Sequence, residues 1–222
     1  GIVKHSLGWI FTVFALGTLI ILFPLTLGLI RKRGGEALLR FWGRGMLFIA
    51  GVSLETEGLE CLRERECRIV TINHASTLDM FIVSALTPKG SIHIIKREAR
   101  FLPIIGQAAW LLGVYFLDRR NKERAVKGLA EIAQRMQDDQ GTVCIAPEGT
   151  RSKDGTLQPF KLGVFHLAMA SGAKIYPMLI EGASELWPRK AWVSRSGRIR
   201  VRLMQPMDSS DFEEGNLREK AA

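Results

Sequence analysis

The sequence predicts an α/β fold, with a mostly parallel sheet flanked by helices and a membrane-embedded helical segment in front of it. From residue 67 onward, short apolar runs typical of buried strands alternate with longer segments of helical periodicity. Such alternation is typical of parallel sheets. Ahead of them, residues 7–30 carry no charge, as expected inside a bilayer. We therefore expect membrane-anchoring helices over 1–52 and one α/β domain over 53–222.

The N-terminal apolar segment is long enough to cross a membrane. As a continuous helix, residues 7–30 would extend roughly 36 Å. The cationic run "RKR" follows at 31–33, so the positive-inside rule places the rest of the chain on the cytoplasmic side. Pro24 and Gly28 allow the alternative that the segment enters one leaflet and turns back.

A second stretch, 36–52, mixes Arg40 and Arg44 with leucine, phenylalanine and tryptophan. This pattern is typical of an amphipathic helix lying at a membrane interface. A buried helical hairpin is the alternative for both N-terminal stretches. The first run is apolar on every face, which favours the membrane.

The α/β domain begins with a polar stretch, 53–66, that suits a linker or an exposed strand. Apolar runs then predict strands at 67–72, 91–96, 113–117, 142–146, 174–180 and 198–204. Helical spacing predicts helices at 78–86, 98–110 (interrupted by Pro103), 121–139 and 161–172.

The charge balance favours anionic partners. The chain carries 31 basic and 22 acidic residues, a formal net charge of +9, which suits an anionic membrane or phosphorylated substrates. Zinc-finger spacing, aromatic RNA-binding motifs and long basic blocks are missing from the sequence, so nucleic acid is not expected as a partner. The three cysteines fit no metal motif, and neither a metal nor a cofactor is expected.

Polar residues gather after four predicted strands, where ligand sites of such folds lie. These residues are His74 and Asp79, Lys96, Arg119, and the run Glu148, Gly149, Thr150 and Arg151. An aspartate can orient a histidine that accepts a proton; a structural hydrogen bond is the alternative for that pair taken alone. Ser76 lacks the G-x-S-x-G context of a nucleophile and suits a helix cap.

Residues 147–152, "PEGTRS", favour an anion site. Backbone N–H groups around Gly149 and the Arg151 guanidinium could hold a phosphate, with a plain surface turn as the alternative. Lys96 and Arg119 could complete the pocket, and Lys161 is a weaker candidate.

Four blocks carry a family resemblance: "NHASTLD", the stretch 96–119, "APEGTRS" and "IYPM". Together they resemble the glycerolipid acyltransferase family, in particular the 1-acylglycerol-3-phosphate acyltransferases, over roughly residues 55–205. In the second block Lys96, Pro103, Gly106, Gly113, Asp118 and Arg119 are in place. In the fourth, Tyr176 and Met178 flank Pro177 where valine or isoleucine is usual.

The resemblance implies direct acyl transfer from acyl-CoA or acyl carrier protein to the hydroxyl of lysophosphatidic acid, giving phosphatidic acid in phospholipid biosynthesis. His74 would be the base and Asp79 its orienting partner. The residues implied in substrate binding are Lys96, Arg119, Glu148, Gly149, Thr150 and Arg151. Residues 53–222 would be the acyltransferase domain, held at membrane lipids by the N-terminal helices, with its site on the cytoplasmic face.

Three alternatives stay open at this point. The acceptor could be another lysolipid, such as a lyso-ornithine lipid or a lysophospholipid. The chain could be a non-catalytic membrane lipid-binding protein, or a hydrolase that releases acyl chains to water. The acyl chain length and the choice between coenzyme A and carrier protein do not follow from the sequence.

Overall fold

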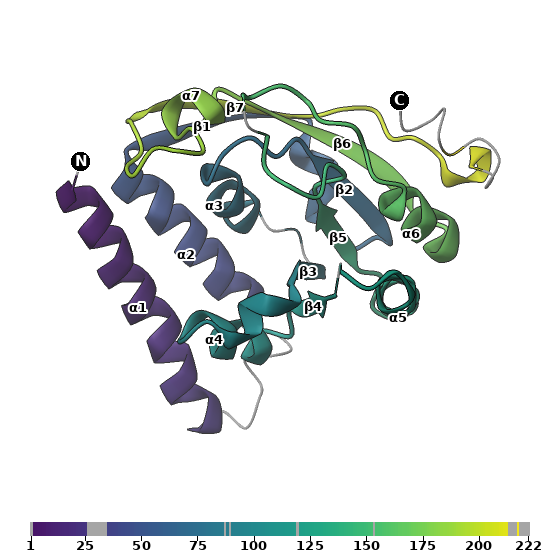
Figure 1. Ribbon diagram of the computed structural model, residues 1–222, viewed down its shortest axis with the longest axis horizontal. Helices are drawn as coiled ribbons and strands as arrows, with labels where there is room; N and C mark the ends of the chain where they lie inside the picture. The colour runs from purple at the N-terminus through teal and green to yellow at the C-terminus, as the bar shows by residue number, and fades with distance from the viewer. Residues whose placement is uncertain are drawn as a thin grey trace.

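The computed structural model describes residues 2–25, 35–86, 88, 90–118, 120–152, 154–212 and 217. Within these residues lies a seven-stranded sheet with the order β1-β7-β6-β2-β5-β3-β4 (Figure 1). Strands β6 and β7 pair antiparallel, and the other pairs are parallel. The strands are β1 (Val52–Glu57), β2 (Arg68–Ile72), β3 (Ser91–Lys96), β4 (Tyr115–Leu117), β5 (Thr142–Ile145), β6 (Lys174–Glu181) and β7 (Gly197–Leu203).

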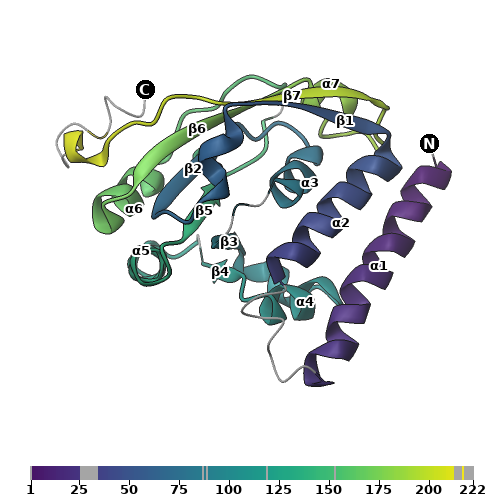
Figure 2. The same ribbon diagram turned by 180° about the vertical axis from the view of Figure 1, so that it is seen from behind.

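Helices cover both faces of the sheet (Figures 1 and 2). On one side lie α1 (Ile2–Leu25), α2 (Gly35–Ala50), α3 (Leu78–Ala85) and α4 (Ile105–Leu111); on the other lie α5 (Lys122–Asp139) and α6 (Gly163–Ser171). The remaining helical turns are η2 (Leu59–Arg63), η3 (Arg97–Phe101), α7 (Ala183–Leu186) and η4 (Ser209–Asp211).

The core has two layers because successive residues of a strand face opposite sides of the sheet. Ile69 of β2 packs with Met136 of α5 and Leu167 of α6. Its neighbour Val70 packs in the other layer, with residues of α2 and α3 such as Phe81. Ile69 and Val70 are fully buried, so side chains pack against β2 on both faces of the sheet.

The N-terminal helices are part of this core. A Cβ on Gly43 of α2 would lie 2.4 Å from the backbone nitrogen of Ala85 in α3, so glycine is what permits this close contact. Beside it, the Trp42 and Phe81 rings meet edge to face with centroids 5.2 Å apart. The contact between α2 and α3 joins the segment 1–52 to the α/β domain.

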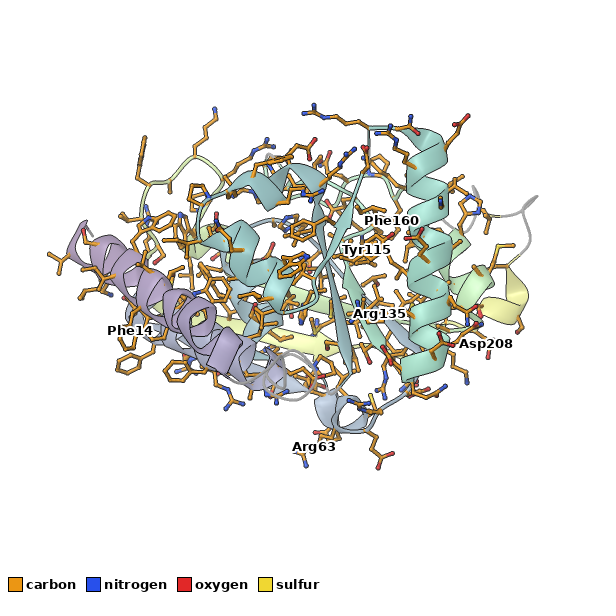
Figure 3. The ribbon with its side chains drawn as sticks, turned by 90° about the horizontal axis from the view of Figure 1, so that it is seen from below. Phe14, Arg63, Tyr115, Arg135, Phe160 and Asp208 are labelled. Atoms are coloured by element: carbon orange, nitrogen blue, oxygen red, sulfur yellow. The ribbon has the colours of Figure 1, made fainter. Side chains whose placement is uncertain are left out.

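Part of the predicted membrane segment lies outside the described residues. Helix α1 ends at Leu25, and 26–34 are not described. Among the residues that are, no helix combines the length and the apolarity that crossing a bilayer requires. Several apolar side chains of α1 are exposed, among them Ile10 and Phe14, which projects from the helix in Figure 3.

The predicted α/β fold with a mostly parallel sheet is confirmed. The strands predicted at 91–96 and 142–146 and the helix at 121–139 match β3, β5 and α5 to within one residue. The stretch 53–66 contributes β1 and η2, and β1 pairs in parallel with β7 at the sheet edge. The break expected at Pro103 separates η3 from α4.

Candidate active site

The turn between β2 and α3 brings a histidine and an aspartate together. His74 Nδ1 lies 2.8 Å from Asp79 Oδ2, as the spacing predicts. The His74 side chain is 30% exposed, whereas Asp79 is 1% exposed. A carboxylate that accepts from Nδ1 selects the tautomer whose Nε2 can accept a proton. The pair therefore has the geometry of a general base and the group that orients it.

The Asp79 carboxylate also organises the turn itself. Oδ2 accepts hydrogen bonds from the backbone N–H groups of Ala75 and Ser76, both at 2.9 Å. The Ser76 hydroxyl accepts from Leu78 N at 3.1 Å and donates to the carbonyl of Trp187 at 2.8 Å. Ser76 is fully buried, and its hydroxyl holds the N–H of Leu78, the first residue of α3, although the N-cap position itself is Thr77.

Glu148, predicted among the substrate-binding residues, accepts hydrogen bonds from two backbone N–H groups. Its buried carboxylate accepts from the N–H of His74 at 2.7 Å and from the N–H of Gln158 at 3.0 Å. The carbonyl of His74 in turn accepts from Ser152 N at 2.7 Å. The loop that follows β5 thus fixes the His74 backbone on both sides.

We expect Glu148→Gln to destabilise the fold by about 1–3 kcal/mol, because the glutamine NH₂ group would face a backbone N–H in place of a carboxylate oxygen. Urea denaturation measures this change. The control is Glu185→Gln, an exposed residue of α7. Equal unfolding free energies for the two variants would contradict the role given to Glu148.

The predicted anion residues converge beside the dyad. Arg151 Nη1 lies 2.7 Å from Thr77 Oγ1, in the same turn as His74. Gly149 adopts φ +72°, and a Cβ there would lie 2.8 Å from Lys161 Nζ, so glycine allows this ammonium to approach the backbone. Lys161 is anchored by its own N–H, which donates to the carbonyl of Pro147 at 2.9 Å. Arg151 therefore contacts the turn that carries His74, and Lys161 lies against the turn that carries Gly149.

The remaining predicted residues lie at the surface or outside the described residues. Lys96 is exposed at the end of β3, and Thr150 is exposed in the turn that carries Gly149. Arg119 lies outside the described residues.

Comparison with known proteins decides the family. Residues 53–181 match the family model described as Acyltransferase. The chain belongs to the acyltransferase family. The matched range contains the His74–Asp79 turn and the Glu148–Arg151 turn of this acyltransferase-family chain, so its family region includes both halves of the candidate site.

The curated relatives share a name. The chain is 34% identical over 187 residues to a 1-acyl-sn-glycerol-3-phosphate acyltransferase of Cocos nucifera, covering 84% of this chain and 60% of the relative. It is 31% identical over 160 residues to the alpha form from Homo sapiens, covering 72% and 56%. The acyltransferase-family chain thus spans less than two thirds of these relatives' length.

A solved structure supports the fold. The crystal structure of the 1-acyl-sn-glycerophosphate (LPA) acyltransferase PlsC from Thermotoga maritima matches with a TM-score of 0.70 at 24% identity. The match covers 98% of this chain and 92% of that one. The N-terminal helices are therefore included in the structural likeness.

An apolar cavity of about 230 Å³ starts at the same turn. It reaches from Thr77 and Met80 to the N-terminal helices and to the segment that follows α7. Its apolar lining includes Trp9, Trp42, Met46, Ile49, Phe81, Ile105, Trp187 and Val193. Hydrophobic burial makes such a lining suited to a hydrocarbon chain. The cavity thus begins at Thr77 and Met80, which lie on either side of Asp79 in the sequence.

Sequence reasoning missed the contacts that hold this site together. Gln158 and Ser152 act through backbone N–H groups, and Trp187 through its carbonyl. Backbone groups leave no residue-type signal. The cavity also joins helices and loops more than 100 positions apart, which no local pattern reveals.

Proposed function

We propose that this chain transfers a fatty acyl group from an acyl thioester to the free hydroxyl of lysophosphatidic acid, producing phosphatidic acid. The observation that carries the proposal is the His74–Asp79 pair, whose side chains lie 2.8 Å apart. The Arg151 guanidinium contacts Thr77, three residues after His74 in the same turn. The names of the relatives, 1-acyl-sn-glycerol-3-phosphate acyltransferases, supply the reaction class.

In the proposed reaction His74 acts on the acceptor directly. Nε2 takes the proton of the acceptor hydroxyl as its oxygen attacks the thioester carbonyl carbon. Asp79 stabilises the imidazolium that forms. The tetrahedral intermediate then collapses, the C–S bond breaks, and the imidazolium returns the proton to the leaving sulfur. The new bond is the ester C–O bond.

An acyl-enzyme intermediate is not required by this route. The Ser76 hydroxyl is buried and engaged in two hydrogen bonds. Burial raises the pKa of the Cys144 thiol to about 12, which leaves it protonated and poorly nucleophilic at neutral pH. These two side chains are thus unsuited to attack the thioester, and the substrate hydroxyl is the nucleophile.

The phosphate of the acceptor and the acyl chain of the donor are assigned to different parts of the site. The acceptor phosphate binds between Arg151 and Lys161, since guanidinium and ammonium groups bind phosphate well. The acyl chain enters the apolar cavity that starts at Thr77. The reacting hydroxyl and thioester then meet at His74, between the cationic turn and the cavity.

We also propose that the chain works at a membrane, with its site on the cytoplasmic face. Exposed apolar side chains of α1, including Ile10 and Phe14, support insertion into one leaflet. The net charge of +9 favours an anionic bilayer surface. Sedimentation of the chain with liposomes containing phosphatidic acid, against purely zwitterionic ones, tests this part.

The experiment that tests the function is transfer of a labelled acyl group from coenzyme A or carrier protein to lysophosphatidic acid in liposomes. Labelled phosphatidic acid is the expected product. Product from a different lysolipid alone would keep the chemistry and change the acceptor. Labelled free fatty acid without acceptor would indicate a hydrolase, and no product at all a lipid-binding protein.

Arg151→Ala is expected to raise the KM for lysophosphatidic acid about 10- to 100-fold, the effect of losing a charge-assisted hydrogen bond to phosphate. The KM for the acyl donor should change little. Lys190→Ala, an exposed cation near α7, is the control. An unchanged acceptor KM in the Arg151 variant would exclude Arg151 from phosphate binding.

A further inference from the structure

A second polar site lies along the same edge of the sheet as the dyad. The pairings Thr71 with Ile145, His93 with Cys144 and Lys96 with Leu117 set the register of β2, β5, β3 and β4. Continuing that register beyond the strands places four residues at one level, namely His74, Glu148, Arg97 and Asp118. Their order follows the strand order, so Asp118 lies three strands away from His74.

The separation of these two positions follows from sheet geometry. Hydrogen-bonded strands lie about 4.8 Å apart, so three steps place Asp118 about 14 Å from His74. The first and the last of these steps agree with observed contacts, since Glu148 accepts from His74 N and Arg97 donates to Asp118.

A cavity of about 220 Å³ opens at that distant end, between β4, η3 and α5. Arg97, Asp118 and Arg124 supply its charged groups. Gly128 allows α5 to lie close to β4, because a Cβ at this position would lie 2.8 Å from Leu117 Cδ1. Tyr115 lines it as well and lies beside α5, donating to Glu131 (Figure 3).

The charged groups of this cavity are arranged for an anion. Asp118 Oδ2 lies 2.8 Å from Arg97 Nη1 and 3.4 Å from Arg124 Nη1. One carboxylate therefore orients two guanidinium groups and leaves the group of three with a net positive charge. Hydrogen bonding from Arg97 lowers the pKa of Asp118, which keeps it ionised at neutral pH. Each guanidinium has five N–H donors, so donors are available for a phosphate.

We propose that this cavity binds the phosphate at the end of the 4′-phosphopantetheine arm of the acyl donor. The proposal rests on the proposed acyl transfer. An extended chain of the thirteen bonds from thioester sulfur to phosphorus spans roughly 15 Å at the extension per bond of an extended polypeptide. This length matches the strand-step separation of about 14 Å. With the thioester at His74 and the acyl chain in the apolar cavity, the arm crosses the ends of β5 and β3 and its phosphate reaches Arg97 and Arg124.

The test compares three proteins: the unchanged chain, Arg97→Gln with Arg124→Gln, and the control Arg100→Gln with Lys127→Gln. The control removes two exposed cations from the same elements, η3 and α5, that do not line the cavity. Each protein is assayed with palmitoyl-CoA, palmitoyl carrier protein and palmitoyl-pantetheine, which lacks the phosphate. Binding of free 4′-phosphopantetheine and of pantetheine is measured by calorimetry.

We expect kcat/KM for the phosphate-bearing donors to fall about 10- to 100-fold in the Arg97/Arg124 variant only. Turnover of palmitoyl-pantetheine should be equal in all three proteins. A loss with both phosphate-bearing donors supports the phosphate that they share; a loss with one of them supports the site and identifies that donor. Equal losses with palmitoyl-pantetheine, or no loss, would overturn the proposal.

Calorimetry separates this result from failure of the proposed function. If no donor acylates lysophosphatidic acid, tighter binding of 4′-phosphopantetheine than of pantetheine by the unchanged chain, lost in the Arg97/Arg124 variant, still supports the cavity. Equal binding of the two compounds would overturn it. Circular dichroism of the three proteins checks that the variants are folded.

Discussion

His74→Ala is expected to lower kcat for acyl transfer about 10²- to 10⁴-fold, the usual contribution of a general base. The fold should survive, because the His74 side chain is partly exposed and the turn is held by its backbone. The KM values should change far less than kcat, since the base acts in the transition state more than in binding. Steady-state kinetics with labelled donor measures both.

The control for this variant is His166→Ala, which removes an exposed histidine of α6 on the far side of the sheet. We expect its kcat to equal that of the unchanged chain. A His74→Ala chain that kept kcat within about threefold would contradict the direct-attack mechanism, because no such small factor fits the loss of a general base.

The sheet was predictable because its strands carry strong local signals. The run 91–96 contains three isoleucines, which are β-branched, and β3 has these bounds. The antiparallel pairing of β7 was not predictable, because nothing local in 197–203 specifies the direction of its neighbour β6. For the polar stretch 53–66 the sequence left a linker or an exposed strand open, and β1 is an exposed strand at the sheet edge, where a polar strand faces water on one side.

The candidate site also has one part that the sequence predicts and one part that it does not. His74 and Asp79 are five positions apart, so one strand-to-helix turn brings them together, and the sequence predicts the pairing. The role of Glu148 depends on contacts with His74 and Gln158, residues separated from it by 74 and 10 positions. Its residue type suggests substrate binding, whereas its burial and hydrogen bonds indicate that it fixes the position of the base.

The structure also relates the N-terminal helices to the chemistry. The sequence predicts them as a membrane anchor, and α1 and α2 supply one wall of the apolar cavity through Trp9, Trp42 and Met46. Thr77, one residue before α3 and three after His74, also lines that cavity. A chain drawn from a bilayer into this cavity would therefore present its carboxyl end to His74, which links the proposed membrane contact to the proposed reaction.

Asp79→Asn is the second large effect expected, a fall in kcat of about 10²- to 10⁴-fold with the fold intact. The asparagine oxygen can replace Oδ2 and keep the hydrogen bonds from Ala75 N, Ser76 N and His74 Nδ1. Its NH₂ group would take the place of Oδ1, which is buried without a hydrogen-bond partner among the described residues. The geometry is therefore kept while the charge that stabilises the imidazolium is lost.

This variant separates charge from position, which His74→Ala does not. The matched control is Asp138→Asn, which removes one carboxylate charge from the exposed face of α5. We expect equal unfolding free energies for the two variants to within about 1 kcal/mol, with kcat lowered only in Asp79→Asn. If Asp79→Asn kept its kcat, the carboxylate would serve only to cap the turn, and His74 would act without a charged partner.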